Sequence, residues 1–195
     1  CTDGSKGSSD PNISSPALVK IRQTEQEAAA RVLGVKKVIF LGYEDSMLEP
    51  TLELRRDIVK EIRRHKPNVI ICPSPTRNLS EKGYIGHPDH IAAGEATLSA
   101  IFPSSRDRLT YPELIEEGLE PHKVREVLVT ERENADTWID VTAEIEVAIE
   151  ALRQHISQIG DNDVATGMRK GRSNTGKSKG ISYAESFKSF KFSVD

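Results

Sequence analysis

The sequence has no long apolar run and no cysteine framework, and these absences exclude several classes of protein. No apolar stretch in the 195 residues approaches the roughly 20 residues that a membrane-spanning helix needs. No signal-peptide pattern opens the chain. The two cysteines, Cys1 and Cys72, form neither a metal-type spacing nor a disulfide pattern. We therefore expect a cytoplasmic protein in a reducing environment, with no membrane span.

An excess of positive charge is also absent. The chain has 27 Lys and Arg against 30 Asp and Glu, which gives a net charge of −3, so no overall basic field recruits nucleic acid. The basic residues of segment 51–66 are interleaved with Asp57 and Glu61, which is typical of a solvated helix face. With 36% hydrophobic residues, the composition is that of one globular domain, and we predict a single domain over residues 1–195.

The chain also begins without methionine. Its first residue is Cys1, and Thr2-Asp3-Gly4 is typical of the exit of a strand, with no strand before it. The rest of the chain has the pattern of the later part of an α/β domain. We therefore expect the sequence to start inside a longer gene, with the first strand and first helix missing.

Predicted helices and strands alternate along the chain. Apolar runs predict strands at 35–41, 68–72, 124–130 and 138–141, and amphipathic stretches predict helices at 16–33, 51–66, 87–102 and 142–159. This order predicts a Rossmann-like three-layer α/β/α fold, with a mostly parallel sheet covered by helices on both faces. The polar, glycine-rich segment 160–180 is predicted to be a flexible loop.

Local signals set the helix ends and faces. Ser15 is a candidate N-cap, Pro16 suits the first helical position, and Gly34 suits the residue after the helix. In the second helix a stripe of Leu54, Ile58 and Ile62 is expected to face the core. The basic residues are expected to lie mostly off that stripe; they are Arg55, Arg56, Lys60, Arg63 and Arg64.

Residues 171–178, GRSNTGKS, fit the phosphate-binding pattern G-x-x-x-x-G-K-S. Such a loop needs a strand leading in and a helix leading out, so that backbone amides can surround phosphate. The approach here, DNDVATGMRK, is polar, and the exit contains Gly180. Nucleotide binding is therefore a remote alternative, and a basic flap that meets an anionic substrate or is simply solvated is the favoured interpretation.

The stretch HPDH, residues 87–90, places two histidines one helical turn apart where a loop becomes a helix. It follows the strand 68–72, and ligands in open α/β sheets lie outside the carboxyl ends of strands. A lone histidine at a helix start is usually a cap or a solvated side chain, but a pair around an aspartate in this place favours a site. Catalytic zinc takes three protein ligands, so HPDH cannot be the whole site.

Several segments resemble the LmbE-like, or PIG-L, family of zinc-dependent N-acetylglucosamine deacetylases. They are TDG at 2–4, R-x-x-E at 22–25, A-x-x-L-G-V at 30–35, FLGYED at 40–45, HPDH at 87–90, D-V-T at 140–142, A-L-x-x-H-x-S-Q at 151–158 and Y-A-E-S-F at 183–187. Their order and spacing extend over nearly the whole chain. The resemblance implies hydrolysis of the N-acetyl group of a GlcNAc-type sugar conjugate to acetate and a free amine.

The resemblance also implies roles for particular residues. His90 would be a metal ligand for Zn²⁺, although His/carboxylate sites also accept other divalent metals. His87 would stabilise the tetrahedral oxyanion or protonate the leaving amine, and Asp89 would tune and orient His87. Sugar hydroxyls would be bound by Arg22 and Asp45, and also by Tyr84, whose register relative to HPDH differs from the family pattern. The remaining residues carried over, His155 and Gln158, would be supporting residues behind the site.

One part of the family pattern is missing. The other zinc ligands and the general base come from an A-H-P-D-D motif that precedes the TDG turn, and this sequence does not contain it. We therefore expect the chain alone to bind zinc poorly and to lack activity. The alternative is a non-catalytic sugar-binding or oligomerisation module of the same fold. The family resemblance also allows a homo-oligomer, and the substrate is expected to be a small amino-sugar molecule.

Overall fold

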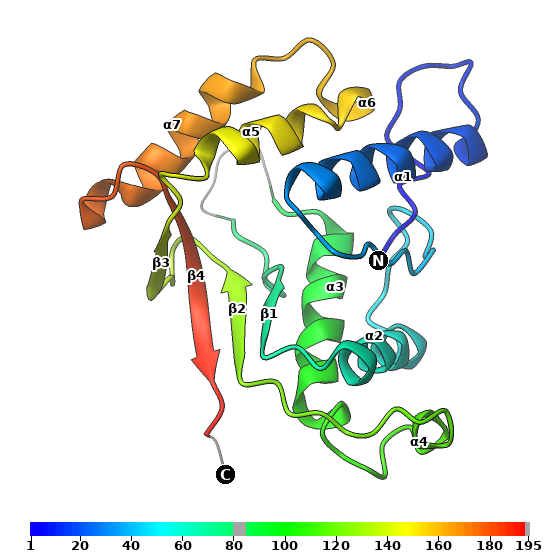
Figure 1. Cartoon of the computed structure of the whole chain (residues 1–195). Helices are drawn as coiled ribbons and strands as arrows, with labels where there is room; N and C mark the ends of the chain where they lie inside the picture. The colour runs from blue at the N-terminus through cyan, green and yellow to red at the C-terminus, as the bar shows by residue number, and fades with distance from the viewer. Residues whose placement is uncertain (80–84, 194–195) are drawn as a thin grey trace. The chain divides into compact units, whose positions relative to one another are not determined.

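A computed structural model describes residues 1–79 and 85–193, and the chain in it forms two compact units (Figure 1). Unit 1 comprises Cys1–Asp45 and Thr137–Ser186, and unit 2 comprises Ser46–Asp136 and Phe187–Asp195. Each unit is considered by itself. The single domain expected from composition stays a prediction.

The sheet of unit 2 combines parallel and antiparallel pairing. Strand β1 (Val69–Cys72) pairs in parallel with β2 (Glu126–Thr130), so that Val69 lies opposite Glu126. Strand β2 pairs antiparallel with β4 (Ala184–Lys191), where Thr130 lies opposite Phe187. In unit 1, β3 (Thr137–Asp140) lies beside the start of β4, which gives the strand order β1-β2-β4-β3. The chain therefore has the mixed α/β fold predicted from the sequence.

Strand β4 was not among the strands predicted from the sequence, where residues 183–187 stood only as a segment of the family resemblance. Its buried side chains are Ala184 and Phe187, and lysines occupy two of the remaining positions. The period-two alternation that identifies a half-buried strand is therefore weak in β4.

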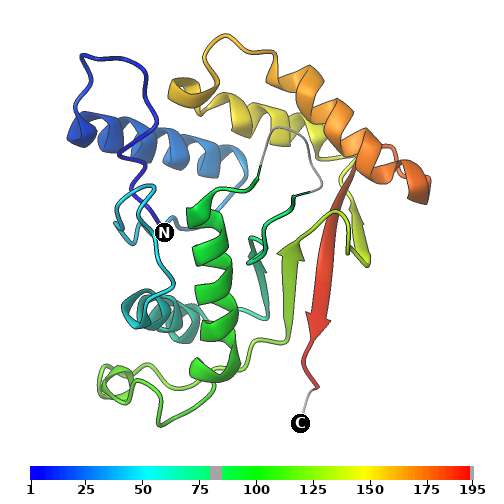
Figure 2. The ribbon, with the colours of Figure 1, turned by 180° about the vertical axis from the view of Figure 1, so that it is seen from behind.

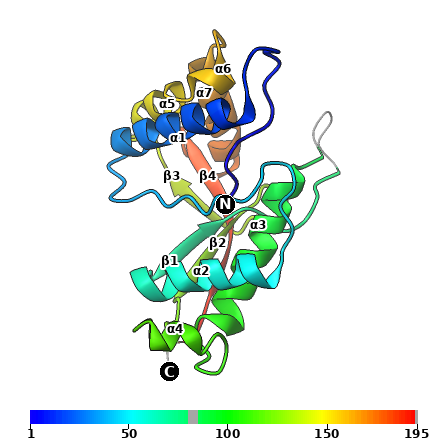
Figure 3. The ribbon, with the colours of Figure 1, turned by 90° about the vertical axis from the view of Figure 1, so that its right-hand side faces the viewer.

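The helices of unit 2 are α2 (Leu52–His65), α3 (Pro88–Ser99) and the short α4 (Glu113–Glu116). A π-helical turn, η1 (Ala100–Ser104), continues α3. Figure 2 shows α3 running alongside β1, and α2 lies next to α3 (Figure 3). Their common core is apolar; its buried members are Val59, Ile62, Cys72, Ala100, Ile101, Leu114, Val124 and Val127. The predicted helices at 51–66 and 87–102 and strands at 68–72 and 124–130 are confirmed within a few residues.

One residue of α2 corrects the predicted helix face. Arg63 was expected off the core-facing stripe, but it is only 1% exposed. Its guanidinium donates to five carbonyl oxygens at the end of η1 and in the segment that follows η1: those of Ser104, Ser105, Asp107, Thr110 and Tyr111. Five carbonyls directed at one point create a site that a planar five-donor group can fill, and helical periodicity does not report such a site.

Unit 1 is helical apart from its part of the sheet. Its helices are α1 (Ser15–Val32), α5 (Ile145–Arg153), α6 (Ile156–Ile159), α7 (Val164–Gly176) and the 3₁₀ turn η2 (Lys177–Lys179). Figure 1 shows α5 between α1 and α7, and it contacts both. The N-cap of α1 is Ser14, whose side chain accepts from the Ala17 N–H at 3.4 Å. The cap predicted at Ser15 is thus one residue late.

The helix predicted over 142–159 is in fact two helices. The backbone leaves the helical region at His155, which ends α5 and makes α6 a separate turn. Ser157 in α6 donates from both its backbone N–H and its hydroxyl to the carboxylate of Glu25 in α1. This tertiary contact is not visible to a sequence pattern.

The flexible loop predicted at 160–180 is also wrong, because α7 occupies most of it. Asp163 caps α7 by accepting from the Thr166 N–H at 3.1 Å. Ala165 and Met168 pack on Ile145 and Ile149 of α5. The phosphate-loop pattern at 171–178 lies in α7 and η2, so its backbone N–H groups are not arranged as a loop around phosphate, and the nucleotide alternative loses its structural basis.

The strand predicted at 35–41 does not form among the described residues. The only β-type contact of this region there is an isolated parallel bridge between Thr2 and Tyr43. Val35, Ile39 and Phe40 remain exposed. An apolar run becomes a strand only when a neighbouring strand pairs with its N–H and C=O groups, and the described residues provide no such strand for 35–41.

In the described part of the chain, no helix combines the length and apolarity that crossing a bilayer requires.

Candidate active site

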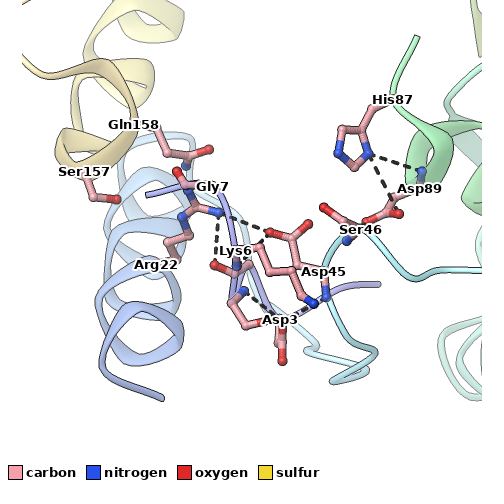
Figure 4. Close-up of polar contacts among 12 residues, drawn as sticks. Asp3, Lys6, Gly7, Arg22, Asp45, Ser46, His87, Asp89, Ser157 and Gln158 are labelled. Carbon is pink, nitrogen blue, oxygen red and sulfur yellow. Dashed lines mark hydrogen bonds and ion pairs between the residues drawn. The ribbon is translucent and has the colours of Figure 1, made fainter. Parts of the chain in front are cut away.

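In unit 1, Arg22 of α1 holds the loop that follows the TDG turn. Its Nη1 donates to the Gly4 carbonyl at 3.0 Å, and its Nη2 donates to the Gly7 carbonyl at 3.1 Å. Nη1 also lies 3.4 Å from Oδ2 of Asp45, with which it forms an ion pair (Figure 4). The Nε atom is buried and has no hydrogen-bond partner among the described residues. The sequence-predicted pair Arg22 and Asp45 is therefore in direct contact.

Asp3 organises the other side of the same cluster. Its Oδ1 accepts from the N–H of Ser5 at 2.9 Å and from the N–H of Asp45 at 3.2 Å. Burial raises the pKa of Asp3, but the hydrogen bonds from Ser5 and Asp45 outweigh it, so the net pKa of this carboxyl lies below its ordinary value of 3.8. A charged Asp3 thus fixes the backbone that presents Asp45.

Glycine at position 4 lets Arg22 approach the turn. Gly4 has a φ of +69°, and a Cβ atom there would lie 2.7 Å from Cδ of Arg22. Any larger residue therefore meets both backbone strain and a steric clash. The TDG turn, Arg22 and Asp45 form one polar cluster in which a guanidinium lies beside a carboxylate. Such a pair can donate to and accept from neighbouring hydroxyl groups.

In unit 2, the HPDH stretch begins α3 as predicted. His87 is the N-cap, and its Nδ1 accepts from the N–H of Asp89 at 3.2 Å, while Pro88 occupies the first turn (Figure 4). Helix α3 lies close to the segment after β1: a Cβ atom added at Gly94 would lie 2.5 Å from the Pro73 carbonyl oxygen, so only glycine fits there. Gly94 thus allows the start of α3 to sit at the carboxyl end of β1, where sites in α/β sheets gather.

The carboxylate of Asp89 is engaged by backbone groups. Asp89 is only 5% exposed, and its carboxylate accepts from the N–H of Ser46 at 2.7 Å (Figure 4). It also accepts from the N–H of Leu48 at 3.3 Å. Its distance to Nδ1 of His87 is 3.8 Å, longer than a hydrogen bond. The direct link of Asp89 to the His87 ring is therefore its backbone N–H, and its carboxylate anchors the segment 46–48.

The second histidine is open to solvent. His90 is exposed, and its ring centroid lies 5.6 Å from that of His87. A neutral His87 ring that accepts at Nδ1 carries its proton on Nε2. Two imidazoles one turn apart, one half-exposed and one exposed, can bind a metal ion or donate to a substrate oxygen.

The late motif residues lie in unit 1. Nε2 of Gln158 is 3.5 Å from Nδ1 of His155, at the long end of a hydrogen bond. The structure thus brings together His155 with Gln158, Arg22 with Asp45, and His87 with Asp89 and His90. The predicted sugar-binding residue Tyr84 lies outside the described residues.

Sequence reasoning assigned no role to Asp3, Glu25 or Ser157, although each makes a central contact in unit 1. Asp3 and Glu25 belong to the TDG and R-x-x-E segments, so the motifs contained them. The signal that could have identified Glu25 is its spacing from Arg22, because residues three apart lie on one helix face.

The sheet with its flanking helices makes this an α/β protein, and its histidine pair lies at the start of α3. The sequence profile of the GlcNAc-PI de-N-acetylase (PIG-L) family matches residues 1–101. The chain belongs to this family, as the HPDH and TDG segments predicted.

Individual relatives agree with this assignment. The chain is 34% identical over 157 residues to diacetylchitobiose deacetylase of Thermococcus kodakarensis, a match covering 80% of this chain and 57% of the relative. It is 37% identical over 93 residues to a probable N-acetyl-α-D-glucosaminyl L-malate deacetylase 2 of Bacillus anthracis, covering 47% of this chain and 38% of the relative. The chain thus spans about half the length of the curated relatives it matches.

A solved structure is similar over nearly the whole chain. N,N′-diacetylchitobiose deacetylase from Pyrococcus horikoshii, in complex with its inhibitor MPG, superposes with a TM-score of 0.88 at 28% identity. The match covers 97% of this chain and 70% of that one. The fold of the described residues is therefore that of a deacetylase of this family.

Proposed function

We propose that this chain is the larger part of a metal-dependent deacetylase that hydrolyses the N-acetyl group of a GlcNAc-type sugar conjugate. The products would be acetate and a free amine. The observation that carries the proposal is the histidine pair at the start of α3, where Nδ1 of His87 accepts from the Asp89 N–H and the imidazole of His90 is exposed. Family membership and relatives named as deacetylases support it.

The donor groups of unit 2 fit part of a metal site. The exposed imidazole of His90 suits zinc, or another divalent metal that accepts nitrogen ligands. The Asp89 oxygens already accept from two backbone N–H groups, which supports an anchoring role for this carboxylate. We propose that His90 holds the metal together with ligands from residues outside this chain. A metal bound there would supply a water acidified to a pKa of about 7.

The roles of this chain's own residues follow from their contacts. Because Nδ1 of His87 accepts from the Asp89 N–H, the proton of a neutral ring is on Nε2, which can donate to the oxygen that gains charge during amide hydrolysis. Arg22 and Asp45 would bind sugar hydroxyls through the exposed side of their ion pair.

Two exposed apolar segments support a missing strand. In unit 2, β1 is an edge strand whose Ile71 side chain is 60% exposed. In unit 1, Val35, Ile39 and Phe40 are exposed on a segment that has no strand partner in the part of the chain that the structure describes. Each is what a neighbouring strand would cover. We propose that a strand outside these 195 residues carries the remaining ligands, as the family pattern implies.

Zinc titration and an acetate-release assay on an N-acetylglucosamine conjugate test this proposal. The chain of 195 residues should bind zinc weakly and release no acetate. The protein extended upstream should bind zinc tightly and release acetate, and His90→Ala in the extended protein should abolish both the zinc binding and the acetate release. His65→Ala, which removes an exposed histidine at the end of α2, is the matched control. Zinc-dependent turnover by the 195 residues alone would refute the proposal that the metal site needs ligands from outside them. An extended protein that binds sugar but releases no acetate would favour the non-catalytic sugar-binding module.

A further inference from the structure

Glu25 is a buried carboxylate that the proposed chemistry does not use. It lies on α1 and is 8% exposed. Its Oε1 accepts from the backbone N–H of Ser157 at 2.6 Å, and its Oε2 accepts from the Ser157 hydroxyl at 2.7 Å. Both distances are short, as expected for charge-assisted hydrogen bonds. We call this pair of contacts the Glu25–Ser157 latch; it lies entirely within unit 1 and joins α1 to α6.

The latch fixes an element that has little stability of its own. Helix α6 has only 4 residues, follows a non-helical residue at His155 and ends at Gly160, whose φ is +53°. A helix this short is not stable alone, because one turn fixes several dihedral angles for very few hydrogen bonds. A buried, doubly bonded carboxylate therefore determines where α6 lies on α1.

The residue next to the latch is the exposed Gln158. Its Nε2 is directed to Nδ1 of His155, which leaves Oε1 able to accept a hydrogen bond from a ligand. Figure 4 shows the Gln158 side chain on the side of α6 that faces Gly7 and the Arg22 guanidinium, and α6 contacts α1. Arg22 and Glu25 are one helical turn apart and share a face of α1.

We infer that Glu25 is a positioning residue: through Ser157 it holds Gln158 beside Arg22, where the Gln158 carboxamide accepts a hydrogen bond from a hydroxyl group of the sugar. This inference rests on the proposed sugar site at Arg22 and Asp45. A fixed carboxamide beside a guanidinium and a carboxylate adds an acceptor, and it lowers the entropy lost when a long side chain is ordered by a ligand. The R-x-x-E and H-x-S-Q segments thus act as one device.

Binding of free N-acetylglucosamine to the 195-residue chain, measured by calorimetry or ligand-observed NMR, tests the inference. Gln158→Ala should weaken binding about 10-fold, the size of one lost hydrogen bond to an uncharged group. Glu25→Ala should weaken it by a similar factor, and the double variant by no more than either single one, because both changes remove the same contact. Glu25→Gln should recover most of the affinity, since its amide can still accept from the Ser157 N–H and donate to the hydroxyl.

Matched controls separate positioning from general damage to the fold. Glu27→Ala removes an exposed carboxylate from the same helix, and Gln154→Ala removes a glutamine whose side chain donates to the carbonyl and carboxylate oxygens of Glu150. Both should bind the sugar like the unsubstituted chain. Amide hydrogen exchange at Ser157 should speed up in Glu25→Ala and remain slow in Gln158→Ala.

The outcomes are distinguishable. Multiplied losses in the double variant, or unchanged affinity in Glu25→Ala, would overturn the positioning role and leave the proposed function standing. If the unsubstituted chain fails to bind the sugar, the proposed sugar site fails and the inference fails with it.

Discussion

Two arginines hold loops in the two units, and they do so differently. Arg63 of α2 is almost completely buried, and its acceptors among the described residues are backbone carbonyls of η1 and of the segment that follows η1. Arg22 of α1 keeps 15% of its side chain exposed and forms an ion pair with Asp45, and its buried Nε has no hydrogen-bond partner among the described residues. Arg63 donates to backbone carbonyls. Arg22 instead divides its donors between two backbone carbonyls and the partly buried carboxylate of Asp45.

Under the proposed function, the difference separates a structural arginine, Arg63, from one proposed to bind the sugar, Arg22. Burial lowers the pKa of Arg63, with nearby acidic groups acting against that effect, and a cation in this position is retained because several carbonyls would otherwise be left unpaired. In the proposed function, Arg22 contacts the sugar through the 15% of its side chain that is exposed. Substitutions at Arg63 should therefore change stability and leave sugar binding intact, whereas substitutions at Arg22 should change both.

The largest expected effect is that of Arg63→Met. The side-chain volume is roughly kept, but five carbonyls lose their donor, so the free energy of unfolding should fall by about 3 kcal/mol. Urea denaturation measures it. Arg64→Met is the matched control, because Arg64 is partly exposed and forms a surface ion pair with Glu61, and its effect should stay within about 0.5 kcal/mol. Equal losses in the two variants would mean that the buried fork contributes nothing special.

Arg22→Lys comes next. Lysine has one point-like ammonium group in place of the planar fork and cannot serve Gly4, Gly7 and Asp45 together. We expect a loss of about 1–2 kcal/mol in the free energy of unfolding and about 10-fold weaker binding of N-acetylglucosamine. Arg31→Lys, at the exposed last turn of the same helix, should change neither. Unchanged sugar affinity in Arg22→Lys would remove Arg22 from the proposed site.

These two arginines also show what a sequence can predict. Arg22 was identified through its resemblance to a family motif, while Arg63 was assigned to the solvated face because helical periodicity treats every charged residue as outward. The helices and strands with regular patterns, such as α2, α3, β1 and β2, were predicted well. The elements that failed depend on tertiary partners: 35–41 needs a neighbouring strand, and α7 depends on packing against Ile145 and Ile149.

The candidate site was predictable to a similar extent. Motif spacing located His87, Asp89 and His90 at the start of a helix, and the structure places them there. The contacts of Asp89 with Ser46 and Leu48 join residues more than 40 positions apart, and nothing in the local sequence encodes them. The same is true of Glu25 and Ser157, which are 132 positions apart.

Gly4 offers a smaller test of how closely Arg22 is fitted to its loop. Gly4 and Gly42 both have positive φ, but a Cβ at Gly42 meets nothing within 4 Å, whereas a Cβ at Gly4 meets Arg22. In Gly42→Ala the free energy of unfolding should therefore fall by about 1 kcal/mol, from backbone strain alone. Gly4→Ala should lose up to about 1 kcal/mol more, measured by urea denaturation. Identical losses would show that the Arg22 side chain moves aside without penalty.

The smallest effect concerns acid stability at the Arg22 cluster. The backbone N–H groups of Ser5 and Asp45 both donate to the same oxygen of Asp3, Oδ1. Asp3→Asn can therefore keep both hydrogen bonds while removing the charge. Because the folded-state pKa of Asp3 lies below its ordinary value of 3.8, its contribution is present above that value and is lost as the pH falls through the folded pKa. Between about pH 4 and pH 2 the unsubstituted chain should lose stability more steeply than Asp3→Asn, as followed by urea denaturation at each pH. Asp10→Asn, at an exposed loop position, should leave the slope unchanged. Parallel curves for Asp3→Asn and the unsubstituted chain would mean that the charge on Asp3 does not stabilise the turn, and that the N–H contacts alone hold Asp45 in place beside Arg22.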